Sequence, residues 1–202
     1  MLSVFLVAAV TAVMTYCLLW RRLENRDTAI AMRRLDLVQK LAPKAREFYR
    51  EIGPGTEALH LEMTRSLGSG EEPGDLRKNF LQKLREKRFQ DRELGLTSFG
   101  PHRDDLLAFI DGKTVRDFAS QGQKRSVALA LKLAAARLLE EASGLPPILL
   151  LDDVFAELDS GRRERLGAMI KGLGQVFITT PGRGDLPFAV DGVFNLEHGR
   201  AV

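Results

Sequence analysis

The sequence has 202 residues, of which 45% are hydrophobic and 28% charged, a balance that excludes a disordered chain and is typical of a globular one. Thirty Lys and Arg against 27 Asp and Glu give a net charge of +3, too small to indicate a nucleic-acid partner without a local cluster. The single cysteine, Cys17, excludes an intramolecular disulfide and a metal site built from cysteines.

Residues 1–22 form the first predicted segment, an apolar helix. Its first 20 residues, Met1 to Trp20, contain no charged side chain, and Arg21 and Arg22 follow directly. About 20 apolar residues can span a bilayer as a helix, and the basic pair would leave the remaining chain in the cytoplasm. Two alternatives stay open: a segment translated from a truncated or frameshifted start, or a helix that packs on protein outside this chain.

Residues 23–95 are predicted to form a helical arm and a connecting segment. Apolar residues recur at helical spacing from Leu23 to Ile52, and Pro43 is expected to kink this helix or to begin a second one. Alternating apolar and polar residues predict a strand at Leu59–Met63. A basic helix is expected from about Asp75 to Arg92.

The basic helix is a candidate DNA contact, because its cations could neutralise phosphates. It has no alternating aromatic residues for base stacking, so a contact would read the DNA backbone rather than the sequence. The alternative is the solvated face of an ordinary amphipathic helix. The candidate DNA-binding residues are Arg77, Lys78, Lys83, Arg85, Lys87 and Arg88.

Residues 96–202 alternate strands and helices, which predicts an α/β fold with a mainly parallel sheet and flanking helices. The apolar run Ile148–Leu151 is expected to be a strand buried on both faces, and Asp111-Gly112 a hairpin turn. The other expected elements are strands at Leu96–Phe99, Leu106–Ile110 and Val176–Thr179, helices at Gln121–Glu141 and Arg162–Ile170, and a hairpin at Val193–Val202.

Two carboxylates, Asp152 and Asp153, follow the Ile148–Leu151 strand. Ligand sites in open α/β sheets lie at the carboxyl ends of strands, and Mg²⁺ prefers carboxylate oxygens. In nucleotide hydrolases the first acid of such a pair holds Mg²⁺, and the second can polarise the attacking water. The alternative is a buried strand that ends in two solvated acids.

Residues Ser120 to Gln123 stand where the long helix is expected to begin. A helix amino terminus offers unpaired N–H groups and a positive dipole end, which together suit a phosphate. Ser120 can donate to a phosphate oxygen, and Gly122 permits close approach of the backbone. The alternative is a serine that only caps the helix.

The sequence contains no phosphate-binding loop of the form Gly-x-x-x-x-Gly-Lys-Ser/Thr. Gly112-Lys113-Thr114 matches its last three letters, but Leu107 stands where the first glycine is required. The chain alone is therefore expected neither to bind ATP tightly nor to hydrolyse it.

Taken together, these motifs resemble those of known ATPases. The order of Ser120 to Gln123, long helix, Leu149-Leu150-Leu151-Asp152-Asp153 and Ala156-Glu157-Leu158-Asp159 resembles the signature, Walker B and D-loop succession of ABC-type ATPases. Two strings, GPHRDDL at 100–106 and RDFASQGQKR at 116–125, look like hallmarks of the RecF family of DNA replication and repair proteins, short-armed relatives of the SMC proteins. The resemblance runs from about Leu23 to the carboxyl end and is specific across residues 100–159.

The resemblance implies the carboxyl-terminal lobe of an ABC/SMC-type P-loop ATPase head, without its P-loop. Such heads dimerise around ATP and Mg²⁺, and the signature of one subunit meets the γ-phosphate held by the other. Thr179 and Thr180 stand where related enzymes place a γ-phosphate sensor. The implied site residues are Ser120, Gln121, Gly122, Gln123, Asp159 and Thr180 for the nucleotide, Asp152 for the metal and Asp153 for catalysis.

The resemblance also implies partners. These are gapped DNA or a junction of single strand and duplex, a second copy or a complementary amino-terminal half, and recombination mediator proteins. The location implied is cytoplasmic, at the nucleoid, and the chain would be an ATPase half-site that hydrolyses ATP only with a P-loop from another polypeptide. The alternative is a non-enzymatic interaction module, with or without a membrane tether at residues 1–20.

Overall fold

A computed structural model describes residues 26–64, 73–96, 98, 100–155, 158–182, 186–197 and 200–201. The expectations for residues 1–22 fall outside these ranges. The chain divides into two compact units, Met1–Ala142 and Ser143–Val202. Among the described helices, none combines the length and the hydropathy needed to cross a bilayer.

Helix α2 (Arg26–Ile52) is the longest helix described in the first unit, and it continues through Pro43 without ending. Proline removes one helical hydrogen bond, which is why a kink or a second helix was expected. The apolar stripe nevertheless continues on both sides of Pro43, and burial of this stripe favours one uninterrupted helix. The buried side chains of the stripe are Leu41, Ala45, Tyr49 and Ile52, which are 6%, 0%, 1% and 0% exposed.

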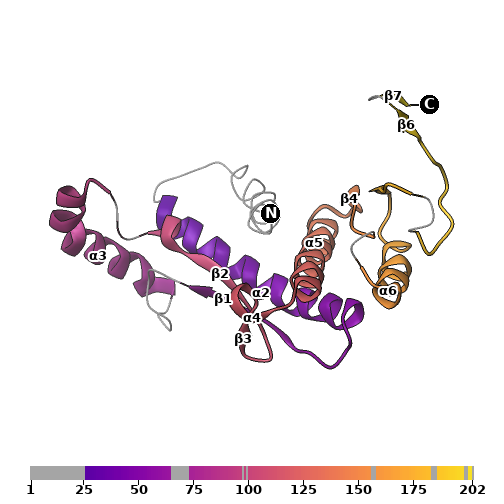
Figure 1. Cartoon of the computed structure of the whole chain (residues 1–202). Coiled ribbons are helices and arrows are strands. Elements are labelled where there is room, and N and C mark those ends of the chain that lie inside the picture. The colour runs from indigo at the N-terminus through magenta and orange to yellow at the C-terminus, as the bar shows by residue number, and fades with distance from the viewer. Residues whose placement is uncertain are drawn as a thin grey trace. The chain divides into compact units, whose positions relative to one another are not determined.

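A three-stranded antiparallel sheet lies beside α2 (Figure 1). Its strands are β1 (Leu59–Thr64), β2 (Asp105–Ile110) and β3 (Lys113–Thr114), in the order β1-β2-β3. The expected turn between β2 and β3 is confirmed, because Asp111 and Gly112 both have positive φ, 48° and 78°. Two successive residues with positive φ form the tight turn that matches the twist of an antiparallel hairpin.

The remaining elements of the first unit are helices. They are α3 (Pro73–Leu94), the 3-10 turn η1 (Pro101–Arg103), α4 (Val115–Phe118) and α5 (Gln121–Ser143). Helix α2 packs against β1, α3 and η1, while α5 buries an apolar face that includes Val127, Leu133 and Ala134. The predicted basic helix and the predicted long helix are thus both confirmed, each within two residues of its expected ends.

The predicted strand at Leu96–Phe99 is wrong for its described residues. Leu96 lies in a bend and is 46% exposed, and Ser98 belongs to no strand. Asp91 accepts hydrogen bonds from both the backbone N–H (2.9 Å) and the hydroxyl of Ser98, so this segment is tied to the end of α3 instead. A local side-chain contact has therefore replaced the expected strand pairing.

The second unit pairs β4 (Leu149–Asp152) with β5 (Val176–Thr179) in parallel, and α6 (Ser160–Ile170) lies between them in sequence. The rings of Phe155 and Phe188 meet edge to face at 5.5 Å. A short hairpin, β6 (Leu196–Glu197) and β7 (Arg200–Ala201), follows where a hairpin was expected. The predicted α/β fold is correct, but among the described strands parallel pairing is confined to β4 and β5.

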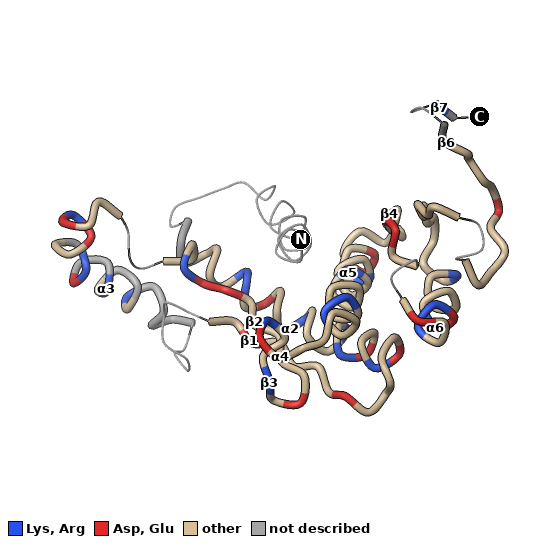
Figure 2. Tube along the Cα trace, viewed as in Figure 1, with Lys and Arg blue, Asp and Glu red and all other residues tan. Residues whose placement is uncertain are grey.

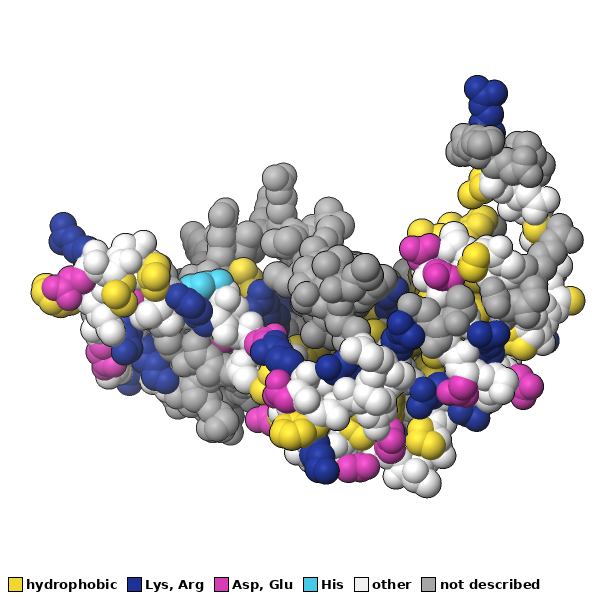
Figure 3. Space-filling model, in the orientation of Figure 1, with side chains coloured by type: hydrophobic (Ala, Val, Ile, Leu, Met, Phe, Trp, Pro, Cys, Tyr) yellow, Lys and Arg dark blue, Asp and Glu magenta, His cyan; other side chains and the backbone are white. Residues whose placement is uncertain are grey.

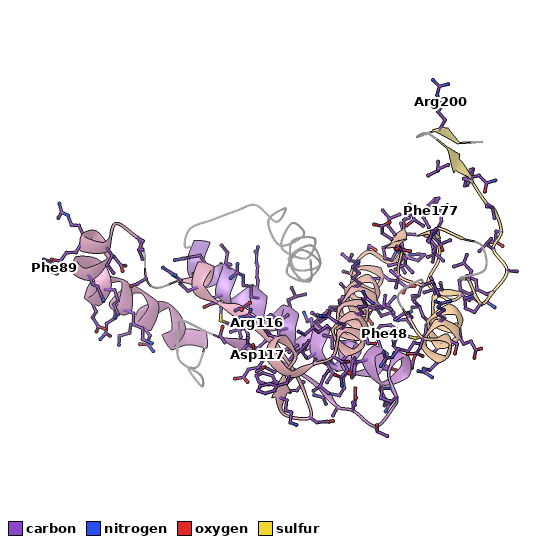
Figure 4. All side chains as sticks on the ribbon, viewed as in Figure 1. Phe48, Phe89, Arg116, Asp117, Phe177 and Arg200 are labelled. Atoms are coloured by element: carbon purple, nitrogen blue, oxygen red, sulfur yellow. The ribbon has the colours of Figure 1, made fainter. Side chains whose placement is uncertain are left out.

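The expectation that Ile148–Leu151 is buried on both faces is wrong. Leu149 and Leu151 are buried, whereas Ile148 and Leu150 are 61% and 68% exposed. Phe177, which is labelled in Figure 4 and is the register partner of Leu150, has an exposed fraction of 46%. Side chains alternate across a strand, so the described pair buries one face and leaves an apolar face uncovered.

Substitution of two glycines in the second unit can measure how much a positive φ contributes to its stability. Gly144 follows α5 with φ of 73°, whereas the φ of Gly172 lies outside the left-handed region, and an added Cβ at either position meets no atom within 4 Å. We expect Gly144→Ala to lower the free energy of unfolding by about 1 kcal/mol, because alanine disfavours positive φ. Gly172→Ala, the matched control, should change it by less than about 0.5 kcal/mol. Urea titration would measure both, and an equal loss in the two variants would contradict the prediction.

Candidate functional site

The amino terminus of α5 is closed by a reciprocal pair of hydrogen bonds. The N–H of Gln123 donates to Oγ of Ser120 at 3.2 Å, and Oε1 of Gln123 accepts from the N–H of Ser120 at 2.8 Å. This is a capping box, in which the residue before the helix and the third helical residue satisfy each other's backbone groups. Ser120, Gln121, Gly122 and Gln123 therefore form one structural element, as expected. The capping box uses neither the Gln121 N–H nor the Gly122 N–H.

The segment that leads into this helix is fixed by side chains from both hallmark strings. Arg116 forms an ion pair with Asp105 of β2 at 3.0 Å, and the hydroxyl of Thr114 donates to Asp117 at 2.8 Å. Arg116 and Asp117 are labelled in Figure 4. Arg116 and Asp105 are 70% and 50% exposed, so this pair contributes at most about 1 kcal/mol. It does bring the GPHRDDL and RDFASQGQKR strings together in space.

The Gly100-Pro101-His102-Arg103 string has a structural contact of its own. The carbonyl oxygen of Pro101 accepts a hydrogen bond from the guanidinium of Arg34, which lies on α2. Gly100 has φ of 142°, in a region that residues with a Cβ rarely adopt. The string therefore forms a tight turn anchored to α2.

The two acids of the second unit lie at the carboxyl end of the parallel strand pair. Asp152 of β4 is in register with Thr179 of β5, and the Thr179 hydroxyl donates to Oδ1 of Asp152. The N–H of Asp153 donates to Oγ1 of Thr179 at 3.1 Å and to its carbonyl oxygen at 3.2 Å. Both carboxylates are exposed, so a ligand can reach them.

Of the two threonines, Thr179 is the one that contacts the acids. The hydroxyl of Thr180 instead donates to the carbonyl oxygen of Gly182 at 3.1 Å. Thr180, which the sequence suggested as a nucleotide contact, is therefore one residue away from Thr179, whose side chain bonds Asp152. The parallel register could have indicated this, because the last residues of two paired strands of equal length meet at one edge.

The acids have the donor chemistry of a Mg²⁺ site that is shared with a nucleotide. Among the described residues, no group of three or more His, Cys, Asp or Glu side chains is placed to hold a metal ion. Mg²⁺ usually keeps several waters and binds through one or two carboxylates together with phosphates. Asp152 meets that requirement, because its hydrogen bond to Thr179 uses Oδ1 and leaves Oδ2 outside this bond.

Asp159 has a local structural role. It caps α6: its Oδ1 accepts a hydrogen bond from the N–H of Arg162 at 3.0 Å, and its Oδ2 lies 3.5 Å from Nε of Arg162. The hydrogen bond from the Arg162 backbone is the main reason that the pKa of Asp159 lies below its ordinary value of 3.8. The other end of the expected D-loop, Ala156 and Glu157, lies outside the described residues.

The candidate DNA-binding helix α3 carries charges of both signs. It contains seven Lys or Arg and four Asp or Glu residues, and the two kinds interleave along its length (Figures 2 and 3). Lys78 and Lys87 are exposed, Lys83 is half-buried, and Nζ of Lys87 donates to Gln90 at 3.1 Å. The side chains of Arg77, Arg85 and Arg88 lie outside the described part of the structure.

Comparison with known proteins gives a consistent result. No family model matches the chain. The DNA replication and repair protein RecF of Rippkaea orientalis is 40% identical over 172 residues, which are 84% of this chain and 45% of that protein. RecF of Listeria welshimeri is 42% identical over 157 residues, 76% of this chain and 42% of that protein. The chain thus spans less than half the length of these relatives.

Solved structures agree with the sequence comparison. A structure of the recombination mediator protein RecF-ATP in the RecFOR pathway matches 87% of this chain and 46% of its own, with a TM-score of 0.74 and 30% identity. A second RecF structure matches the same shares, with a TM-score of 0.72 and 33% identity. The predicted family and the predicted ATPase-head fold are therefore confirmed.

The Asp159 cap provides a direct test of the local structure. We expect Asp159→Ala to lower the free energy of unfolding by about 1 kcal/mol, because the Arg162 N–H loses its acceptor. Asp159→Asn, the matched control, keeps an acceptor oxygen and should retain most of that stability. Urea unfolding at pH 7 would measure the three proteins, and an alanine variant as stable as the native chain would refute the assignment.

The same carboxylate predicts a pH dependence. Its pKa is lowered in the folded chain, so its ionisation stabilises the fold above the ordinary value of 3.8, and this stabilisation is lost as pH falls through the lower folded value. Asp159→Asn removes that titration. The stability difference between the native chain and this variant should therefore be constant near neutral pH and should change below about pH 4. A difference that does not vary with pH would contradict the lowered pKa.

Proposed function

The chain belongs to the RecF family of DNA replication and repair proteins, and we propose that it forms the signature- and Walker B-bearing lobe of an ATP- and DNA-binding head. The observation that carries this proposal is the pair of exposed acids, Asp152 and Asp153, at the carboxyl edge of a parallel strand pair. A buried pair could not have reached a nucleotide. The curated relatives are named for DNA replication and repair, and one solved relative is a RecF-ATP structure, which supports ATP as the nucleotide.

The lobe would act on a triphosphate that is held by the P-loop of another polypeptide, because the 202 residues of this chain contain no P-loop motif. The donors it offers are the amides of Gln121 and Gly122 and the hydroxyl of Ser120, whose oxygen already accepts from Gln123. An N–H pair at a helix amino terminus, together with the positive end of the helix dipole, stabilises the charge on a γ-phosphate. A second copy of a complete head, or a complementary amino-terminal half, would supply the P-loop.

The acids would serve the metal and the water. Asp152 is the proposed Mg²⁺ ligand, and a bound Mg²⁺ would neutralise part of the phosphate charge. Thr179 holds one oxygen of Asp152 and also accepts from the Asp153 N–H, so it fixes the geometry of both acids. Asp153 would accept a proton from, or orient, the attacking water. Asp159 and Thr180 would contact the nucleotide in addition to making their local hydrogen bonds.

DNA would be bound through the basic side chains of α3. Lys78 and Lys87 are exposed, and the helix has an excess of positive charge, which suits contact with backbone phosphates rather than with bases. Gapped DNA or a junction of single strand and duplex is the proposed target, with recombination mediator proteins as partners. Action on chromosomal DNA would place the chain in the cytoplasm, at the nucleoid.

The half-site proposal predicts weak nucleotide binding by the chain alone. Calorimetric titration of the 202-residue protein with ATP and Mg²⁺ should show no binding with a dissociation constant below about 1 mM, which corresponds to roughly 4 kcal/mol of binding free energy. The physical reason is that two amides and a hydroxyl replace the many phosphate contacts of a P-loop. Tighter binding that is lost in Asp152→Ala would instead show a complete site and overturn the proposal.

The DNA proposal predicts a change in salt dependence. In Lys78→Ala/Lys83→Ala/Lys87→Ala, the slope of log K against log salt concentration should become shallower by about 0.9 for each phosphate contact removed. The control, Arg50→Ala/Lys113→Ala/Lys171→Ala, removes the same charge from exposed positions outside α3. Fluorescence anisotropy with a gapped duplex would measure both. Equal slopes in the two triple variants would show that α3 is only a solvated helix face.

A further inference from the structure

Both ends of the half-buried side-chain amide of Gln123 make hydrogen bonds within the protein. Its Nε2 donates to Oε1 of Glu57 at 2.8 Å, while its Oε1 accepts from the N–H of Ser120 at 2.8 Å. The reversed amide would place Nε2 against the Ser120 N–H and Oε1 against the Glu57 carboxylate, so that donors face donors and acceptors face acceptors. Only one orientation is therefore compatible with both neighbours.

Glu57 lies 66 residues before Gln123 in sequence, in the connection between α2 and β1, and its second oxygen is also engaged. Oε2 accepts a hydrogen bond from the hydroxyl of Tyr49 at 2.5 Å. Tyr49 is 1% exposed, so its hydroxyl lies within the protein and benefits from an internal acceptor. The carboxylate thus joins a buried residue of α2 to the first turn of α5.

We propose that Glu57 and Tyr49 are positioning residues that fix, through Gln123, the phosphate-facing donors of Ser120, Gln121 and Gly122. This proposal rests on the proposed function of the signature and gives Gln123 a different role from a direct nucleotide contact. Gln123 accepts from the Ser120 N–H through its side chain, and its own backbone N–H donates to Oγ of Ser120, so it positions both the backbone and the hydroxyl oxygen of Ser120. Donors that are held in place before the nucleotide arrives lose less entropy on binding.

Two further hydrogen bonds within α5 engage the carbonyl oxygens of the turn that contains Gly122. The hydroxyl of Ser126, which is 1% exposed, donates to the carbonyl oxygen of Gly122 at 3.0 Å. The N–H of Lys124 donates to the carbonyl oxygen of Ser120 at 2.9 Å. The acceptor groups of this turn are therefore satisfied within the helix, whereas its amide donors at Gln121 and Gly122 lie outside the capping box. Such an arrangement favours an anion over a cation.

Glu57→Gln is the informative single change, because it is nearly isosteric and breaks the pattern of donors and acceptors. With two amides in place of one amide and one carboxylate, any orientation either opposes two donors or removes the acceptor that position 57 offers to the Tyr49 hydroxyl. We expect amide hydrogen exchange at Ser120 and Gln123 to become about three- to ten-fold faster, which matches the loss of one hydrogen bond. Glu51→Gln, an exposed carboxylate-to-amide change on α2, is the matched control.

The double variant Glu57→Gln/Gln123→Glu provides the rescue. The new amide at 57 donates to the new carboxylate at 123 and accepts from Tyr49, while the carboxylate at 123 accepts from the Ser120 N–H, so all three hydrogen bonds return. Exchange at Ser120 and at residue 123 should return to within about two-fold of the native rate. Tyr49→Phe, which removes the bond to Oε2 and keeps the Gln123–Glu57 bond, should accelerate exchange in the same direction and by less.

The functional readout is titration of each full 202-residue protein with inorganic tripolyphosphate, followed by the NMR shifts of the Gln121 and Gly122 amides. We expect a response in the native chain at millimolar concentrations, an affinity about three- to ten-fold weaker in Glu57→Gln, and recovery in the double variant. An unchanged response in Glu57→Gln, with a normal native response, would overturn the proposal and leave the proposed function standing. No response in the native chain would overturn the role of the signature itself, and the positioning proposal with it.

Discussion

Helix α2 holds the first unit together through side chains that reach into neighbouring loops. Arg34 binds the carbonyl oxygen of Pro101, Arg46 donates to the carbonyl oxygen of Leu59 at 3.1 Å, and Tyr49 binds Glu57. These contacts attach the η1 turn, the start of β1 and the connection between α2 and β1 to one helix. The uninterrupted course of α2 through Pro43 is a condition for all three, because a break there would separate Arg34 from Tyr49.

The second unit depends on a different constraint, the register of two parallel strands. Because Asp152 and Thr179 are register partners, the Thr179 hydroxyl can donate to the Asp152 carboxylate at the edge of the sheet. The same register sets Leu150 beside Phe177 on an uncovered face. A shift of one residue would separate Asp152 from Thr179 and turn the apolar face over, so the geometry of the acids and the exposure of the face have a single origin.

The features that could be predicted from the sequence are those set by near neighbours. The Asp111-Gly112 turn, the capping residue Ser120 and the basic helix each follow from residues within a few positions of one another. The strand expected at Leu96–Phe99 failed because Asp91, a few residues earlier, binds Ser98. The local apolar pattern carried no information about that contact.

The features that could not be predicted depend on contacts between residues distant in the sequence and on which face of a strand is covered. Glu57 gave no signal, since its partner Gln123 is 66 residues away. Thr179 could be distinguished from Thr180 only once the strand register was known. The exposure of Leu150 could not be predicted, because an apolar run has the same sequence whether one face of the strand or both are covered.

The backbone of Asp153 has a consequence for the evolution of this chain. Its φ is 50°, in the left-handed region, where a residue with a side chain is strained and glycine is not. Asparagine and aspartate are the side chains that tolerate this conformation best, so the position admits few residues, and only one of them is an acid. Selection for stability alone would therefore favour glycine at 153, so an acid that is kept at this position in a homologous lineage indicates selection for something other than stability.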